Sequence, residues 1–179
     1  MSFSNVHFIL FKPQLAENIG ACARALKNFN FTKLKLVSPK ISFPNEKVFA
    51  TSVGAKDIIS ASKVYSNLED AIKNTNCVIA TSSRIRKKNY KHLSLNELRK
   101  INFKQKIAIV FGPEASGLTN DEIKRCENDT SASLKITSSN LPDVSLKTKG
   151  PKYVPLSRRG DKPNAIAWLV KYHPELKDS

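Results

Sequence analysis

Four short apolar runs alternate along this chain with stretches long enough to form helices. Each run is nearly continuous instead of alternating between apolar and polar residues, which is typical of parallel strands buried on both faces. The order of strand, helix and strand predicts an α/β fold, a mostly parallel sheet flanked by helices. The four predicted strands are Val6 to Phe11, Leu34 to Val37, Cys77 to Ala80 and Ile107 to Phe111.

A helix is predicted between the first two runs, over residues 18–29, because apolar residues recur there at helical spacing. Arg24 lies off this apolar stripe and near the predicted helix start, so its side chain could reach a site at the strand ends. A solvated arginine on an amphipathic helix is the alternative, and the spacing alone favours it. The residues of the stripe are Ile19, Ala23, Leu26 and Phe29 or Asn30.

The segment after the fourth run has the pattern of a strand, a turn bounded by glycines and a helix start. Gly112 and Gly117 allow backbone angles or a close approach of a ligand that a Cβ atom would obstruct. Thr119 and Glu122 have the spacing of a capping box. A ligand could sit against exposed backbone N–H groups at such a helix start. A turn that only connects two elements is the alternative.

Small hydroxyl residues follow the third run, where Thr81, Ser82 and Ser83 precede Arg84. Such residues form turns, and they also let a ligand approach a strand end closely. The pattern does not decide between these two interpretations.

The length of the chain predicts one domain over residues 1–179, since no Gly/Ser-rich or Pro-rich linker divides the chain. The three cysteines have no paired spacing and the three histidines are scattered, so we expect reduced core thiols and no metal site. The start of the chain lacks the pattern of a secretory leader, and no apolar run has the ~20 residues of a membrane span. We therefore expect a cytoplasmic protein.

The charge of the chain favours a polyanionic partner, because 30 Lys and Arg residues against 15 Asp and Glu give a net charge of +15. Basic residues gather between Arg84 and Lys106, where Glu97 is the single acid. An aromatic residue among them could stack on an unpaired base. A lysine-rich face that only aids solubility is the alternative. The residues expected to contact RNA in this segment are Arg84, Arg86, Lys87, Lys88 and Tyr90.

In combination, these segments resemble the SPOUT superfamily of RNA methyltransferases, specifically its SpoU/TrmH-like branch and most closely the TrmJ type. The resemblance runs from about Val6 to Cys126, and the joint pattern is far more specific than any one motif. It is carried by Asn18, Gly20, Arg24 and Ala25, by Gly54-Ala55 and Asp57-Ile58, by Thr81-Ser82-Ser83-Arg84, and by Phe111-Gly112-Pro113-Glu114 with Gly117 to Glu122.

The resemblance implies transfer of a methyl group from S-adenosylmethionine to a ribose 2′-hydroxyl of RNA, with tRNA the expected substrate. It also implies a deep C-terminal trefoil knot and a homodimer. Arg24, Asn18 and Glu114 would be the catalytic group. Arg24 would orient the 2′-hydroxyl or clamp a phosphate, since arginine is a donor and a poor base, and Glu114 would fix Arg24 or its own loop. The cofactor would contact Thr81, Ser82, Ser83, Gly112, Ile136, Ser145 and Leu146.

Beyond Cys126 the resemblance falters. Residues 134–136 could form the next strand, and Ser145-Leu146 could be the third motif of the family, but Lys147 stands where the family has asparagine. A glycine and two prolines follow where a helix should begin, and proline disrupts a helix interior. This tail, from about residue 127, is a true divergence, a rearranged substrate element or the product of a frameshift.

Two classes of function therefore stay open, a methyltransferase and a non-catalytic RNA-binding relative that has lost productive cofactor binding. A generic nucleotide-binding enzyme is a distant third, because the chain has neither a phosphate-loop lysine motif nor a Gly-x-Gly-x-x-Gly pattern.

Overall fold

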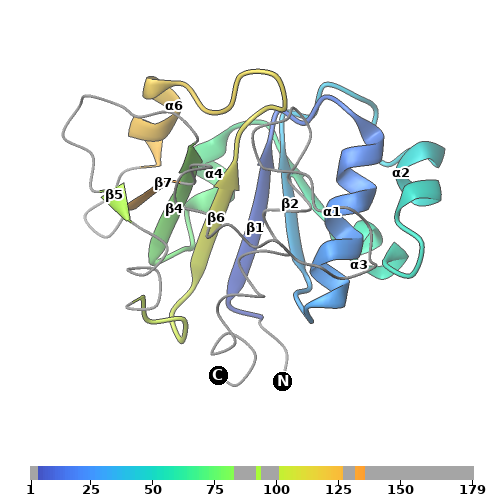
Figure 1. The fold of residues 1–179 in the computed structure, drawn as a ribbon, viewed down its shortest axis with the longest axis horizontal. Helices are drawn as coiled ribbons and strands as arrows, with labels where there is room; N and C mark the ends of the chain where they lie inside the picture. Colours follow the sequence, from blue (N-terminus) through green and yellow to red (C-terminus); the bar gives the residue numbers. More distant parts are fainter. Residues whose placement is uncertain (1–3, 83–91, 94–100, 127–131, 136–179) are drawn as a thin grey trace, which may run out of the picture.

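The computed structural model describes residues 4–82, 92–93, 101–126 and 132–135. Their centre is a seven-stranded sheet in the order β3-β2-β1-β6-β4-β7-β5, and every recorded strand pair is parallel. Figure 1 shows β5 and β7 at one edge of this sheet. The strands are β1 (Val6–Phe11), β2 (Lys33–Val37), β3 (Lys63–Tyr65), β4 (Cys77–Ser82), β5 (His92–Leu93), β6 (Ile107–Phe111) and β7 (Ala132–Lys135).

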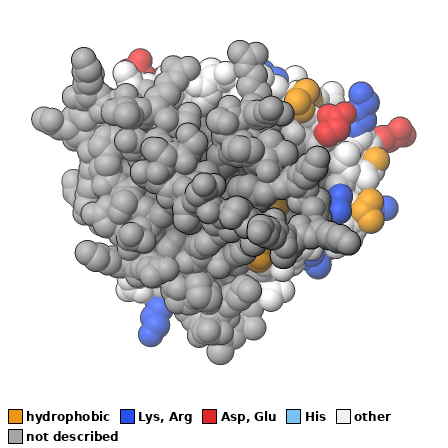
Figure 2. Space-filling model, viewed as in Figure 1, with side chains coloured by type: hydrophobic (Ala, Val, Ile, Leu, Met, Phe, Trp, Pro, Cys, Tyr) orange, Lys and Arg blue, Asp and Glu red, His pale blue; other side chains and the backbone are white. Residues whose placement is uncertain are grey.

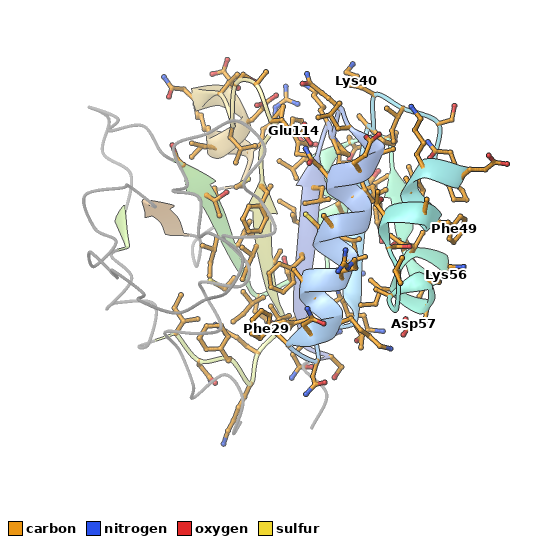
Figure 3. The ribbon with its side chains drawn as sticks, turned by 45° about the vertical axis from the view of Figure 1, so that its right-hand side comes forward. Phe29, Lys40, Phe49, Lys56, Asp57 and Glu114 are labelled. Atoms are coloured by element: carbon orange, nitrogen blue, oxygen red, sulfur yellow. The ribbon has the colours of Figure 1, made fainter. Side chains whose placement is uncertain are left out.

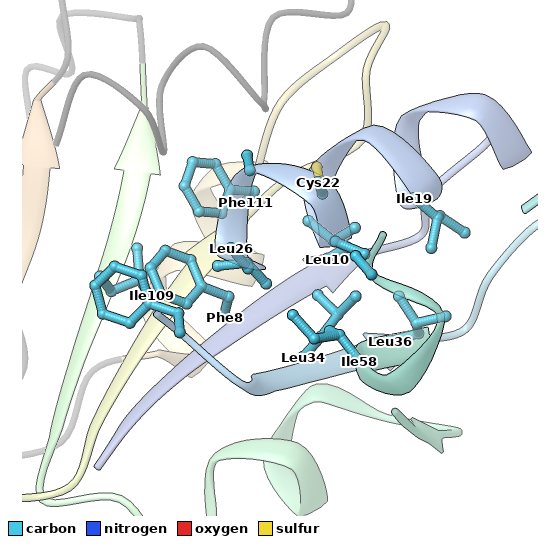
Figure 4. Packing of buried hydrophobic residues seen from close by; sticks show 14 of the residues in the cluster. Phe8, Leu10, Ile19, Cys22, Leu26, Leu34, Leu36, Ile58, Ile109 and Phe111 are labelled. Atoms are coloured by element: carbon cyan, nitrogen blue, oxygen red, sulfur yellow. The ribbon is translucent and has the colours of Figure 1, made fainter. Parts of the chain in front are cut away.

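Helices cover both faces of the sheet, as the continuous apolar runs predict. One core cluster joins α1, α2 and α3 to side chains such as Phe8, Leu36 and Ile109, and a second joins α4 and α6 to the opposite face through Ile9 and Val110. Figure 4 shows the first cluster beneath α1. The helices are α1 (Ala16–Asn28), α2 (Glu46–Thr51), α3 (Lys56–Ala61), α4 (Leu68–Ile72) and α6 (Asn120–Arg125).

The predicted α/β architecture is therefore confirmed, and the four predicted strands are β1, β2, β4 and β6. A strand expected near residues 134–136 is also present as β7. None of the helices within the described ranges is long and apolar enough to cross a membrane. The knot and the Ser145-Leu146 motif fall on residues 136–179, which lie outside the described residues.

Helix α1 buries the predicted apolar stripe, since Ile19, Ala23 and Leu26 are all fully buried. Gly20 lies on the side of α1 that faces the backbone of α2. A Cβ atom at Gly20 would lie 2.7 Å from the carbonyl oxygen of Val48 and 2.9 Å from the backbone nitrogen of Ser52. This glycine therefore allows two helices to pack backbone to backbone.

The prediction that Arg24 lies near the start of α1 is wrong. The helix begins at Ala16 and ends at Asn28, so Arg24 is eight residues in, about 12 Å along the axis at ~1.5 Å per residue. The apolar periodicity located the helix, but it did not show that the helix begins two residues before Asn18.

Candidate functional site

The carboxyl ends of β1, β6 and β4 lie next to one another, and the segments that follow these strands form the candidate site. The register pairs Ala80 with Val110, which brings the end of β4 beside the end of β6. The Thr81 hydroxyl donates a hydrogen bond to the carbonyl oxygen of Val110 at 2.9 Å. Thr81 and Ser82 are half-buried at this strand end. Two of the predicted cofactor residues thus lie beside the loop that holds Gly112.

The loop after β6 requires a glycine at position 112. A Cβ atom there would lie 2.3 Å from the backbone nitrogen of Leu118 and 2.5 Å from the carbonyl carbon of Gly117, because the chain turns back on itself. Gly117 has a φ of +65°, a left-handed angle that favours glycine. The close approach that the sequence predicts at Gly112 is therefore made by the protein backbone. Its contact with a cofactor stays a prediction.

The predicted capping box at the start of α6 is confirmed. The Glu122 backbone N–H donates to Thr119 Oγ1 at 3.2 Å, and the Thr119 N–H donates to Glu122 Oε2 at 2.8 Å. These two donors are satisfied within the helix start, so a ligand at this turn would have to bind other backbone N–H groups, and such a ligand stays a prediction. Sequence spacing identified the cap, but it did not show that the cap occupies the N–H groups.

Lys12, which follows β1, also binds the start of α6 through an ion pair with Glu122. Its Nζ lies 3.0 Å from Glu122 Oε1. Burial alone raises the pKa of Glu122, but hydrogen bonds from Thr119 and Lys12 together with the lysine charge bring it below its usual value. The ion pair therefore ties the end of β1 to α6.

Glu114 joins the loop after β6 to the start of α1. Its Oε1 accepts a hydrogen bond from Asn18 Nδ2 at 3.3 Å, and its Oε2 accepts one from the backbone N–H of Gln14 at 3.0 Å. Figure 3 shows Glu114 at the end of α1 opposite to Phe29. The structure thus brings together Asn18 and Glu114, which are 96 residues apart. Their part in catalysis stays a prediction.

Arg24 is exposed on α1, and no hydrogen bond or ion pair of its side chain to another described residue is recorded. Six residues separate it from Asn18, which is about 9 Å along the helix axis and places the two side chains on different sides of α1. The geometry of α1 therefore keeps Arg24 away from the Asn18–Glu114 contact. The Arg24 side chain faces solvent.

The remaining predicted site residues lie outside the described residues. They are Ser83, Ile136, Ser145 and Leu146 of the expected cofactor site and Arg84, Arg86, Lys87, Lys88 and Tyr90 of the expected RNA surface.

Sequence reasoning missed a pocket at the carboxyl ends of β1 and β2, with a volume of about 310 Å³. Its lining does not include Thr81, Ser82 or Gly112. The polar residues that follow β2 and β3 were a usable signal for it, because parallel strand ends meet at one edge. The lining residues are Phe11, Lys12, Ser38, Ser66, Asn67, Leu68, Thr119, Asp121, Glu122 and Arg125.

Replacing Glu114 with glutamine is expected to lower the free energy of unfolding by about 1 kcal/mol, because one acceptor oxygen becomes an NH₂ group that cannot serve both Asn18 and Gln14. Urea denaturation measures this change. Glu17→Gln is the matched control, since it removes the same charge from an exposed residue in the first turn of α1. Equal stability of the two variants would show that the Glu114 contacts do not hold the loop.

Comparison with known proteins identifies the family. The family model for the SpoU rRNA methylases matches residues 5–140, and a model for the transcriptional cell cycle regulator TrcR matches residues 104–179. The SpoU match ends near the point where the sequence pattern falters.

Curated relatives match the same part of the chain. An uncharacterised tRNA/rRNA methyltransferase of Haemophilus influenzae is 37% identical over 124 residues, which are 68% of this chain and 51% of the relative. The TrmJ tRNA (cytidine/uridine/adenosine-2′-O-)-methyltransferase of Pseudomonas aeruginosa is 36% identical over 127 residues, 68% of this chain and 49% of the relative. The chain therefore spans about half the length of the curated relatives that it matches.

Solved structures share the fold. A probable methylase family protein from H. influenzae superposes with a TM-score of 0.74 at 26% identity, over 98% of this chain and 69% of that one. TrmJ from Z. mobilis gives 0.73 at 23% identity, over 97% and 70%. The SpoU methyltransferase AviRb from Streptomyces viridochromogenes in complex with AdoMet gives 0.60 at 14% identity, over 96% and 59%. With a family match over more than two thirds of its length, the chain belongs to the SpoU rRNA methylase family.

Proposed function

We propose that this protein transfers a methyl group from S-adenosylmethionine to a ribose 2′-hydroxyl of RNA, with tRNA as the substrate. The observation that carries the proposal is the SpoU family match over residues 5–140, which includes every described residue of the candidate site. The curated TrmJ relative is named as a tRNA 2′-O-methyltransferase, and the AviRb neighbour was solved with AdoMet. We place this activity in the cytoplasm with its RNA substrate.

The residues at the ends of β4 and β6 have suitable chemistry for this cofactor. When bound, S-adenosylmethionine supplies a reactive methyl group on a positive sulfonium. The Thr81 hydroxyl donates its hydrogen bond to the carbonyl oxygen of Val110 and keeps its acceptor lone pairs, which suits the hydroxyl and amino donors of an adenosine. The half-buried Ser82 adds a second hydroxyl at the same strand end. These groups would hold the cofactor, while the folded loop from Gly112 to Gly117 forms a rigid wall.

Asn18 and Glu114 would act as positioning residues. Their hydrogen bond fixes the loop after β6 against α1, and holding reacting groups in line is the main contribution available in a methyl transfer. Arg24 would contact the RNA. Its guanidinium suits a phosphate or the 2′-oxygen, because it offers several donors in a planar fork and stays protonated.

We also propose that the protein acts as a homodimer. Arg24 is exposed and lies about 12 Å down α1 from the end at which Glu114 is bound. A second copy packed against this side of α1 would bring its own carboxyl-end loops to Arg24. Sedimentation of the full chain tests this directly.

Calorimetry with S-adenosylmethionine and a tritiated-methyl assay with tRNA test the proposed activity. We expect saturable cofactor binding and transfer of label into tRNA. The methylated position should resist alkaline cleavage, because that cleavage needs a free 2′-hydroxyl. A chain that binds tRNA but shows no cofactor binding would contradict the proposal and favour the non-catalytic RNA-binding relative.

A further inference from the structure

The amino ends of the strands carry a row of basic side chains on the sheet face that α4 and α6 cover. The register pairs His7 with Lys33 and Lys35 with Lys63, and paired residues of parallel strands point to the same face. His7 also pairs with Ala108, so Lys106, two residues earlier, belongs to this face by alternation. We call Lys33, Lys63 and Lys106 the amino-end lysines.

The amino-end lysines are exposed, and no hydrogen bond or ion pair of their side chains to another residue in the described part of the chain is recorded. Lys35, between them, differs. Its Nζ donates to the carbonyl oxygen of Ala71 in the last turn of α4 at 2.5 Å and lies 5.4 Å from the centre of the Tyr65 ring. A cation at a helix C-terminus is stabilising, so Lys35 has a structural role. No such contact is recorded for the three exposed lysines among the described residues.

The charges that act on His7 and Lys35 at this end of the sheet are all positive among the described residues. Burial, followed by the charges of Lys35, Lys33 and Lys106, lowers the pKa of His7 to about 4. Burial, followed by Lys63 and Lys106, lowers the pKa of Lys35. The Nδ1 atom of His7 is buried and has no recorded hydrogen-bond partner within the described residues. The described part of the fold therefore holds the lysine charges together, and no carboxylate acts on His7 or Lys35 there.

The opposite side of the molecule is arranged differently. Over α2 and α3, at the right of Figure 2, basic and acidic side chains are mixed. There Lys27 pairs with Asp57 at 2.6 Å, and Figure 3 shows Lys56 and Asp57 side by side on α3. A general excess of lysine therefore does not explain the charge at the amino ends.

The dimensions of this row indicate the shape of its ligand. Lys63 lies on β3 and Lys106 precedes β6, so the row crosses three strand spacings, about 14 Å. Its lysines are exposed. Separate point charges over this distance suit successive phosphates of a polymer better than one small anion.

The row also lies far from the candidate methyl-transfer site. Lys106 and Gly112 stand at opposite ends of β6, about 20 Å apart at ~3.3 Å per residue. A ligand that contacts both must be long and anionic. Resting on the proposed function, we propose that the amino-end lysines bind the phosphate backbone of the substrate RNA at nucleotides remote from the one that is methylated.

The test compares two variants of the full chain that carry the same net charge, Lys33→Gln with Lys63→Gln and the control Lys47→Gln with Lys56→Gln. Fluorescence anisotropy with labelled tRNA is measured over a series of salt concentrations. Each lost phosphate contact lowers the slope of log affinity against log salt by about 0.7–0.9. We expect the first variant to lose about 1.5 in slope and about tenfold in affinity at low salt, and the control to behave like the unmodified chain.

An equal slope for both variants would overturn the proposal, because the effect would then reflect net charge alone. A loss of binding to vesicles of anionic phospholipid with no loss for tRNA would also overturn it and identify a membrane-contacting face. Calorimetry with S-adenosylmethionine separates this result from the proposed activity. If the unmodified chain fails to bind the cofactor, the methyltransferase proposal fails, while the anisotropy still decides whether these lysines contact RNA.

Discussion

Replacing Arg24 with alanine is expected to lower the rate of methyl transfer to tRNA by about a hundredfold or more, with cofactor affinity and thermal stability unchanged. A misplaced reacting group costs about this much. The stability should survive because Arg24 is exposed, and exposed substitutions without contacts change the free energy of unfolding by about 0.5 kcal/mol or less. Single-turnover transfer of tritiated methyl, calorimetry and a melting curve measure the three quantities.

The variant Arg24→Lys distinguishes a guanidinium that holds two oxygens of a phosphate from a contact that needs only a positive charge. Lysine keeps the positive charge but loses the planar fork, so it should restore little of the rate if Arg24 holds two oxygens at once. A full recovery with lysine would indicate a point-charge contact. Methyl transfer by Arg24→Ala at the rate of the unmodified chain would remove Arg24 from the site altogether.

The strands that build the site could be predicted because they are buried on both faces. Continuous apolar runs gave β1 and β6 with their observed bounds. The edge strand β3 was missed, since it has only three residues and two of them are exposed. Edge strands are paired on one side only, and their residues need not be apolar. The sequence pattern therefore predicts the centre of the sheet better than its rim.

The contacts within the site are harder to predict than its location. The family resemblance grouped Asn18 with Glu114, and the structure adds their hydrogen bond and the second one from the Gln14 backbone. No spacing rule predicts a contact across 96 residues, because it depends on the order of β1 and β6 in the sheet. Gly112 shows the same limit. Its need for glycine comes from Leu118, and the sequence allowed a ligand equally well.

Gly20 is a motif residue whose role in packing follows from the structure alone, and Gly20→Ala is expected to lower the free energy of unfolding by about 1–3 kcal/mol or more. The new methyl group would lie 2.0 Å from Thr51 Oγ1, which can rotate away. It would also lie 2.7 Å from the carbonyl oxygen of Val48 and 2.9 Å from the nitrogen of Ser52, which can move only if α2 moves. Urea denaturation measures the loss.

The sign of this effect separates packing from helix propensity, because alanine is favoured over glycine by about 1 kcal/mol inside a helix. Propensity alone would make Gly20→Ala more stable than the unmodified chain, and that outcome would contradict the packing argument. Ala21→Gly is the control, since Ala21 is the next residue of α1 and is half-buried. Its free energy of unfolding should fall by about 1 kcal/mol through the lower helix propensity of glycine. Adding Thr51→Ala to Gly20→Ala should recover only part of the stability, since the backbone of α2 remains in place.

Methyl transfer by Gly20→Ala should fall as well, because α1 carries both Asn18 and Arg24. A shift of α1 away from the loop after β6 would stretch the Asn18–Glu114 hydrogen bond.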